Sequence, residues 1–239
     1  MRLWVTGYRS YEFPIFNNDD PRVAVIRFAL KRAFINAFDD GLEWVITGGQ
    51  LGVEQWAAMT AVALRDEYPE LHVSMMFPYA EFSHRWKEDK QVQLATLQQQ
   101  VDFHANVSDQ PYQSPAQLRD YQRFMLSHTD AALLVYDQEY PGKPKYDYAA
   151  IERWQQQQDP RAVARARVRA HSAPVFEVTQ SLERQGDDIV PGFAAERSDH
   201  RQAARVLLET RAVHALLRRV GAAGAERGLK VHGYRPSDR

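Results

Sequence analysis

The chain has 239 residues, of which 44% are hydrophobic, with 30 basic and 31 acidic side chains, so it is long and apolar enough for a packed core and is not disordered as a whole. It contains no cysteine, which excludes disulfides, thiolate metal sites and cysteine nucleophiles. No apolar run reaches the roughly 18 residues of a membrane helix, and the stretch Met1–Gly7 is too short for a secretory signal, so we expect a cytoplasmic protein.

Short apolar runs alternate with longer helical patterns over residues 1–160. The predicted strands cover residues 3–5, 44–46, 72–77, 103–107 and 131–136. The predicted helices cover residues 23–38, 52–68, 83–100, 114–127 and 146–157. This alternation predicts an α/β, Rossmann-like fold, with an open, mostly parallel sheet, helices on both faces and right-handed crossovers.

The composition changes near Asp159-Pro160. Residues 1–160 hold 15 basic and 22 acidic side chains, whereas residues 161–239 hold 15 basic and 9 acidic ones and are rich in arginine and alanine. We therefore predict a folded domain over residues 1–160 and a basic, partly mobile C-terminal extension over residues 161–239. An edge strand at 174–178 and a helix at about 199–220 are candidate elements of this extension, and nucleic acid is a possible but less favoured partner for it.

Ligands of open parallel sheets bind beyond the carboxyl ends of the strands, so the loops at those ends supply the candidate site. The candidate ligand-binding residues are Thr6, Gly7, Arg9, Thr47, Gly48, Gly49, Gln50, Gly52, Glu54, Tyr79, Trp86 and Lys145.

Three glycines between a strand and a helix, Gly48, Gly49 and Gly52, are the strongest local signal. Glycine permits positive φ and close backbone approach, and the start of a helix favours phosphate or carboxylate. We expect the main-chain donors near Gln50 to be vacant, so that such a ligand can bind to them. We also expect the substitution Gly49→Val to abolish ligand binding while it leaves the fold mostly intact, because a Cβ blocks the approach of the ligand to the backbone. The alternative interpretation is a tight turn for close helix–sheet packing.

Side chains around this loop each have two interpretations. Arg9 is either a phosphate-binding cation or a residue paired with an acid such as Glu12. Glu54 is either a helix cap or a contact to ribose, and it is a weak candidate for catalysis. Lys145, with Lys143, faces a second phosphate or only solvates a loop. Tyr79 and Trp86 stack on a base or belong to the core.

The eight histidines show no metal-binding spacing, and no serine-hydrolase elbow is present. We expect no metal and no required cofactor.

The residues of these loops, together with others, resemble the YpsA-like family of the SLOG superfamily, whose fold is Rossmann-like. The resembling segments are Val5-Thr6-Gly7-Tyr8-Arg9, Gly41-Leu42-Glu43-Trp44, Gly48 to Glu54, Trp56-Ala57-Ala58, Glu67 to Leu71, Pro111 to Pro115, Ser127 to Asp137 and Lys145-Tyr146. The resemblance covers about residues 1–158, and the extension departs from the family pattern.

The resemblance implies a bacterial protein that binds a nucleotide or a nucleotide-derived ligand such as ADP-ribose or NAD. It also implies a regulator or sensor, with a role in cell-division control and a possible protein partner. Two related groups imply alternatives: N-glycosidic hydrolysis of nucleotides, as in LOG proteins, and binding of single-stranded DNA, as in DprA proteins. The LOG motif PGGxGTxxE is incomplete here, because Pro141-Gly142-Lys143-Pro144-Lys145-Tyr146 lacks the second glycine and the Gly-Thr pair.

Overall fold

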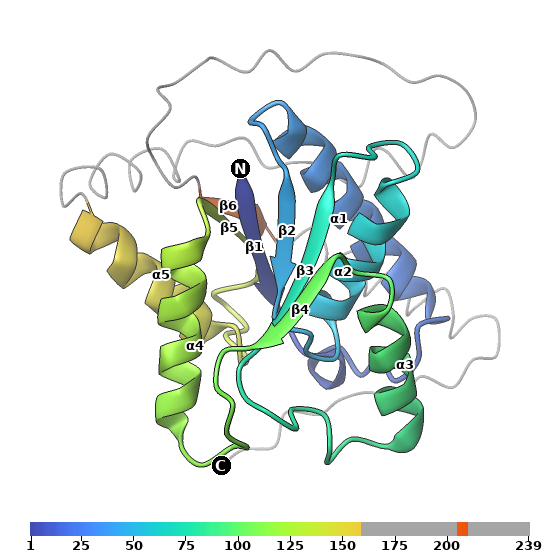
Figure 1. Cartoon of the computed structure of the whole chain (residues 1–239). Coiled ribbons are helices and arrows are strands. Elements are labelled where there is room, and N and C mark those ends of the chain that lie inside the picture. Colours follow the sequence, from blue (N-terminus) through green and yellow to red (C-terminus); the bar gives the residue numbers. More distant parts are fainter. Residues whose placement is uncertain (159–204, 210–239) are drawn as a thin grey trace.

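The computed structural model describes residues 1–158 and 205–209 (Figure 1). Its strands form one parallel sheet in the order β4-β3-β2-β1-β5-β6. The strands are β1 (Arg2–Gly7), β2 (Trp44–Thr47), β3 (His72–Phe77), β4 (Phe103–Asn106), β5 (Ala131–Tyr136) and β6 (Arg205–Glu209). All six residues of β5 are buried, as expected of a strand that helices cover on both faces of a parallel sheet.

Helices cover both faces of the sheet. They are α1 (Pro21–Phe38), α2 (Val53–Leu64), α3 (Glu88–Gln98), α4 (Pro115–His128) and α5 (Lys145–Gln158), with a short 3-10 helix η1 (Ser10–Glu12) after β1. Figure 1 shows α1, α2 and α3 on one side of the sheet and α4 and α5 on the other. From β1 to β4 the chain adds each new strand on one side of β1, and it then returns to place β5 on the other side. Because all crossovers are right-handed, connections that run in these two opposite directions lie on opposite faces of the sheet.

Two helix starts follow the signals in the sequence. Asp20 caps α1 by accepting from the N–H of Arg22, with Pro21 as the first helical residue. Ser114 and Gln117 form a capping box around Pro115 at the start of α4. The predicted starts of both helices are therefore confirmed to within two residues.

Other boundaries differ from the prediction. The segment predicted as helix from residue 83 forms turns until α3 begins at Glu88, because Lys87 has an extended backbone with a φ of −62° and a ψ of 149°. The helix predicted to reach residue 68 ends at Leu64, and turns lead from there to Pro69.

The predictions for the extension fall mostly outside the described residues, and these include the strand at 174–178. The helix predicted at about 199–220 is wrong over Arg205–Glu209, which pairs with β5 as β6. The outer edge of β5 offers a row of backbone donors and acceptors, and a short apolar segment satisfies them as a strand.

A single core lies on both faces of the sheet. Its largest fully buried side chains include Trp4, Trp56, Phe34, Met75 and Met125. None of the helices in residues 1–158 has the length and apolar character needed to cross a membrane.

Candidate functional site

The candidate site lies where the strand order reverses. β1 and β5 are neighbours in the sheet, but the chain leaves β1 toward α1 on one face and leaves β5 toward α5 on the other. Loops that diverge in this way leave room beyond the carboxyl ends of the strands, which is the usual ligand position in open α/β sheets.

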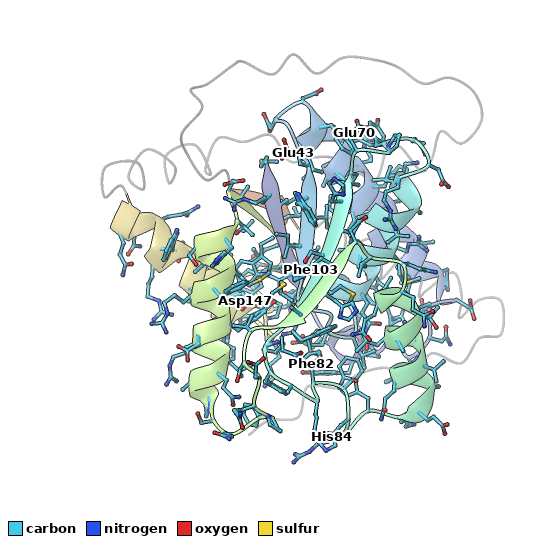
Figure 2. The ribbon with its side chains drawn as sticks, viewed as in Figure 1. Glu43, Glu70, Phe82, His84, Phe103 and Asp147 are labelled. Carbon is cyan, nitrogen blue, oxygen red and sulfur yellow. The ribbon has the colours of Figure 1, made fainter. Side chains whose placement is uncertain are left out.

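A buried polar cluster joins the elements at this point. The hydroxyl Oγ1 of Thr6, in β1, lies 2.9 Å from Glu54 Oε1 at the start of α2 and 3.0 Å from Asp147 Oδ2 in α5. Arg9 Nη1 donates to the same Glu54 oxygen over 2.9 Å. Gln122 Nε2, from α4, donates to Asp147 Oδ1 over 2.7 Å. Figure 2 shows Asp147 between the sheet and the helices that cover this face.

The geometry of this cluster fixes its proton count. The hydroxyl of Thr6 has one hydrogen and cannot donate to two carboxylates at once. Glu54 accepts from a guanidinium and from the N–H of Gln50, 2.9 Å away, so its negative charge is compensated. Asp147 accepts only from the neutral amide of Gln122, so we assign the extra proton to Asp147, which then donates to Thr6.

The electrostatic surroundings agree with this assignment. Burial raises the pKa of Asp147 above its ordinary value, and the nearby charge of Arg9 opposes this only in part. The pKa of Arg9 is raised: burial alone would lower it, but the negative charge of Glu54, and that of Asp147 whenever it is ionised, outweigh that effect. Burial raises the pKa of Tyr121 well above its ordinary value, and the negative charge of Glu54 adds to this. The raised pKa of Asp147 is the direction expected for the carboxyl that carries the shared proton.

All three glycines of the loop after β2 have a packing role. An ideal Cβ on Gly49 would lie 2.5 Å from Phe77 Cε1, and one on Gly52 would lie 2.5 Å from the backbone N of Ser10. A Cβ on Gly48 would lie 2.3 Å from the hydroxyl oxygen of Tyr121. Gly49 and Gly52 also have positive φ angles of 77° and 114°. The expectation that a side chain at Gly49 leaves the fold intact is therefore wrong, because its Cβ would point into the core.

The main-chain donors of this loop are occupied only in part. The N–H of Gln50 donates to Glu54 Oε2, so the prediction that this donor is vacant is wrong. The carbonyl of Gly49 accepts from Gln55 Nε2 over 3.0 Å, which holds the loop against α2. Among the described residues, the N–H groups of Gly49 and Leu51 have no hydrogen-bond partner.

Tyr8 and Arg9 connect the glycine loop with the loop after β5. The N–H of Val53 donates to the carbonyl of Tyr8, and Arg9 forms an isolated antiparallel bridge with Gly52. The buried hydroxyl of Tyr8 accepts from the N–H of Asp137 over 2.8 Å and lies 2.7 Å from the carbonyl oxygen of Tyr140. The ends of β1, β2 and β5 are thus held together by short contacts.

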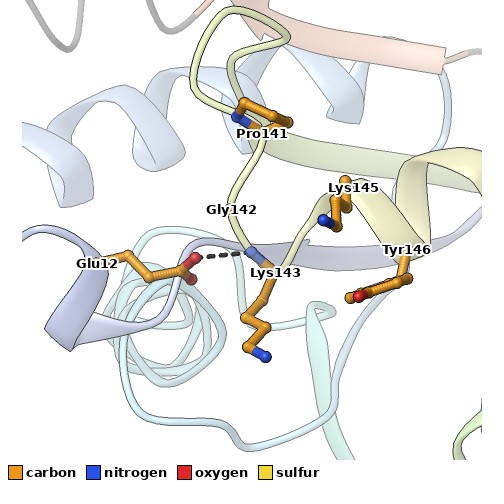
Figure 3. Close-up of a pocket in the computed structure, with 6 residues that line it drawn as sticks. All are labelled: Glu12, Pro141, Gly142, Lys143, Lys145 and Tyr146. Atoms are coloured by element: carbon orange, nitrogen blue, oxygen red, sulfur yellow. Dashed lines mark hydrogen bonds between the residues drawn. The ribbon is translucent and has the colours of Figure 1, made fainter. Parts of the chain in front are cut away.

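A pocket of about 310 Å³ opens beside these loops (Figure 3). It is lined by Glu12, Pro141, Gly142, Lys143, Lys145 and Tyr146. Both lysines and Tyr146 are exposed, and Lys145 Nζ lies 5.2 Å from the centre of the Tyr146 ring. The pocket therefore offers two cationic side chains and an aromatic ring to a solute.

Aromatic side chains extend this edge beyond β3. Tyr79 lies 5.1 Å from Tyr112 and 5.4 Å from Phe82, between ring centres, and Phe82 lies 5.3 Å from Trp86. Tyr79 and Trp86 are only partly buried, and Tyr112 is 48% exposed. Figure 2 shows Phe82 and His84 beyond the carboxyl ends of the strands.

The structure distributes the predicted site residues over four places. Thr6, Arg9 and Glu54 meet in the buried cluster, with Gln50 bonded to it. Gly7, Thr47, Gly48, Gly49 and Gly52 are buried or packed against neighbouring atoms. Lys145 lines the pocket, and Tyr79 and Trp86 belong to the aromatic group.

Sequence reasoning did not single out four residues that shape this edge: Tyr8, Tyr121, Gln122 and Asp147. It named Glu12 only as a possible partner of Arg9, whose side chain pairs with Glu54 instead. Asp147 stands in the first turn after Lys145, but nothing in its spacing shows that it turns inward. Tyr121 and Gln122 lie in a polar helix, where only the three-dimensional packing identifies the buried side. In the described part of the chain, no three His, Asp or Glu side chains come together to hold a metal ion.

An open parallel sheet with a glycine loop and a pocket at the strand reversal defines a Rossmann-like protein of the α/β class. A family model described as the YspA SLOG family, with the short name YpsA, matches residues 3–164. The chain belongs to this SLOG family, and the resemblance found in the sequence is confirmed.

The chain is also similar to bacterial relatives named UPF0398 protein. It is 55% identical over 156 residues to that of Levilactobacillus brevis, which covers 65% of this chain and 82% of the relative. It is 56% identical over 150 residues to that of Lactiplantibacillus plantarum, or 63% of this chain and 79% of the relative. The family match over residues 3–164 spans the strands β1 to β5 and the helices α1 to α5.

Proposed function

We propose that the chain binds a nucleotide-derived, phosphate-bearing ligand, of the class of ADP-ribose or NAD, and acts as a regulator or sensor. The observation that carries the proposal is the pocket at the strand reversal, with Lys143 and Lys145 at its rim. Ammonium groups and unpaired backbone N–H groups are the usual partners of phosphate oxygens.

A ligand of this size can extend from the pocket toward the glycine loop. Arg9 links the two regions, because its backbone pairs with Gly52 and its guanidinium contacts Glu54. The N–H groups of Gly49 and Leu51 supply further donors there. The partly exposed rings of Tyr79 and Trp86 are surfaces on which a base stacks.

Several features favour a binding protein over a nucleotide hydrolase. Glu54, the candidate acid, is 3% exposed. Both of its oxygens accept hydrogen bonds from the protein itself. A catalytic acid or base must reach the proton that it transfers, and Glu54 reaches only Thr6, Arg9 and Gln50.

Calorimetric titration of the full chain with ADP-ribose, NAD and AMP tests the proposal. We expect binding below millimolar concentration, with weaker binding when Lys143 and Lys145 are both replaced by alanine. The double variant with Lys31→Ala in α1 and Lys90→Ala in α3 removes the same two charges elsewhere and is the control. Absence of heat and of competition at millimolar ligand would overturn the proposal, and release of free base from AMP would replace it with the hydrolase.

A further inference from the structure

The carboxylate of Glu12 bridges two loops at the pocket. Its Oε2 accepts from the backbone N–H of Arg9 over 2.7 Å, which satisfies the donor of the residue before η1. Its Oε1 accepts from the backbone N–H of Lys143, also over 2.7 Å, and this residue lies 131 positions further along the chain (Figure 3). The start of η1 needs only the first of these bonds.

The surroundings of Glu12 match those of a bound phosphate. Two backbone donors from separate loops point at one pair of anionic oxygens, and Lys143 and Lys145 line the same pocket. An ideal Cβ on Gly142 would lie 2.1 Å from Glu12 Oε1, so only glycine lets an anion approach this loop so closely. Two cations face one carboxylate, which leaves an excess of positive charge in the pocket.

We propose that Glu12 is an internal competitor for the anion position of this pocket, so that a ligand phosphate displaces its carboxylate from the N–H of Lys143. The phosphate oxygens then accept from this N–H and pair with the ammonium groups of Lys143 and Lys145. This inference rests on the proposed function, because it names how the same pocket recognises and admits its ligand.

Displacement has a structural consequence. The bond between Glu12 and Lys143 joins the loop after β1 to the loop after β5 in the free protein. Binding exchanges this internal bond for bonds to the ligand, so part of the binding free energy is used to displace Glu12. Ligand affinity is therefore lower than the pocket alone would give, and the two loops separate on binding.

The test compares Glu12→Gln with the wild-type full chain, using inorganic pyrophosphate and ADP-ribose as calorimetric probes. Glutamine keeps the size of the side chain but removes its charge, and one of its two terminal atoms is a donor that cannot accept from a backbone N–H. We expect both probes to bind at least about tenfold more tightly to the variant, which is the effect of removing one charge-assisted competitor. Glu70→Gln is the control: it removes the same charge from an exposed residue at the amino end of β3, where Figure 2 shows Glu70.

The outcomes separate the two proposals. Binding to the wild type with equal or weaker binding to Glu12→Gln overturns the competitor and leaves the proposed function standing. Absence of binding to wild type and variant alike overturns both. Pyrophosphate that binds as tightly as ADP-ribose identifies free phosphates as the ligand, whereas a preference for ADP-ribose identifies the nucleotide.

A second measurement does not depend on the fold of the variant. In wild-type protein labelled with ¹⁵N, saturating pyrophosphate should shift the amide resonance of Lys143, since its N–H exchanges the carboxylate of Glu12 for a phosphate oxygen. An unchanged resonance at saturation would contradict displacement.

Discussion

Replacing Asp147 with asparagine tests the proton count of the buried cluster. A protonated Asp147 donates to Thr6 and accepts from Gln122, over 3.0 Å and 2.7 Å. Asparagine makes the same two contacts, because its Nδ2 donates and its Oδ1 accepts. We therefore expect the variant to fold and to be at least as stable as the wild type at neutral pH, even though the substitution is made at a buried polar position.

The expected effect depends on pH with a definite sign. Burial raises the pKa of Asp147 above its ordinary value of 3.8 in the folded chain. Below that value, both the folded and the unfolded chain hold the proton. As the pH rises, the unfolded chain releases its proton first, and the wild-type free energy of unfolding falls by up to about 1.4 kcal/mol per pH unit until the folded-state pKa is reached. The asparagine variant lacks this loss, so its relative stability should increase with pH.

Urea unfolding of the full chain, followed by tryptophan fluorescence between about pH 4.5 and pH 8, measures this difference. Asp130→Asn is the control, because the hydrogen bond from Arg2 lowers the pKa of Asp130 below its ordinary value of 3.8, so Asp130 is ionised in both the folded and the unfolded chain over this range and the stability difference of its variant should not change with pH. An Asp147→Asn variant that is less stable than the wild type by more than about 1 kcal/mol at pH 8, with no gain in its relative stability between pH 4.5 and pH 8, would show that Asp147 is ionised and refute the proton count.

Three further variants probe the contacts that position the site, each measured by urea unfolding. Gly49→Val should lose about 2–5 kcal/mol, because its Cβ would meet Phe77 at a positive φ; a change below about 1 kcal/mol would show that the loop adapts. Tyr8→Phe should lose about 1–3 kcal/mol, since the N–H of Asp137 loses its buried partner, and unchanged stability would mean that water replaces the hydroxyl. Glu54→Gln should lose about 3 kcal/mol by leaving Arg9 without its anion, in contrast to the mild effect at Asp147, and equal effects at both positions would contradict the assigned charges.

Much of the fold could be predicted from the sequence because its signals are local. The strands over residues 72–77 and 131–136 coincide with β3 and β5, and they are apolar runs bounded by proline or polar residues. The starts of α1 and α4 depend on capping residues next to proline, which act within one turn. The turns before α3 were missed because residues 83–87 carry no strong helix breaker, and the extended backbone that separates them from α3 lies at Lys87, a residue type with no such preference.

The position of the site at the strand ends could also be predicted, but the roles of its residues could not. Sequence shows that Arg9 and Glu54 both follow strands; it does not show that they neutralise one another. The inward turn of Asp147 depends on how α5 packs against α4 and β1, which involves residues more than 100 positions apart. Whether a loop glycine faces a ligand or the core likewise depends on side chains from another strand, such as Phe77 in β3.

The close approach of Gly52 to the backbone around Arg9 limits how the chain can change in length. The backbones of these two loops are in direct contact through the bridge between Arg9 and Gly52. One added or deleted residue in segments 7–10 or 48–53 would therefore break the hydrogen bond between Thr6 and Glu54. Natural insertions and deletions in this family should therefore avoid both segments. They should gather instead in turns that face solvent, such as residues 39–41, which are exposed.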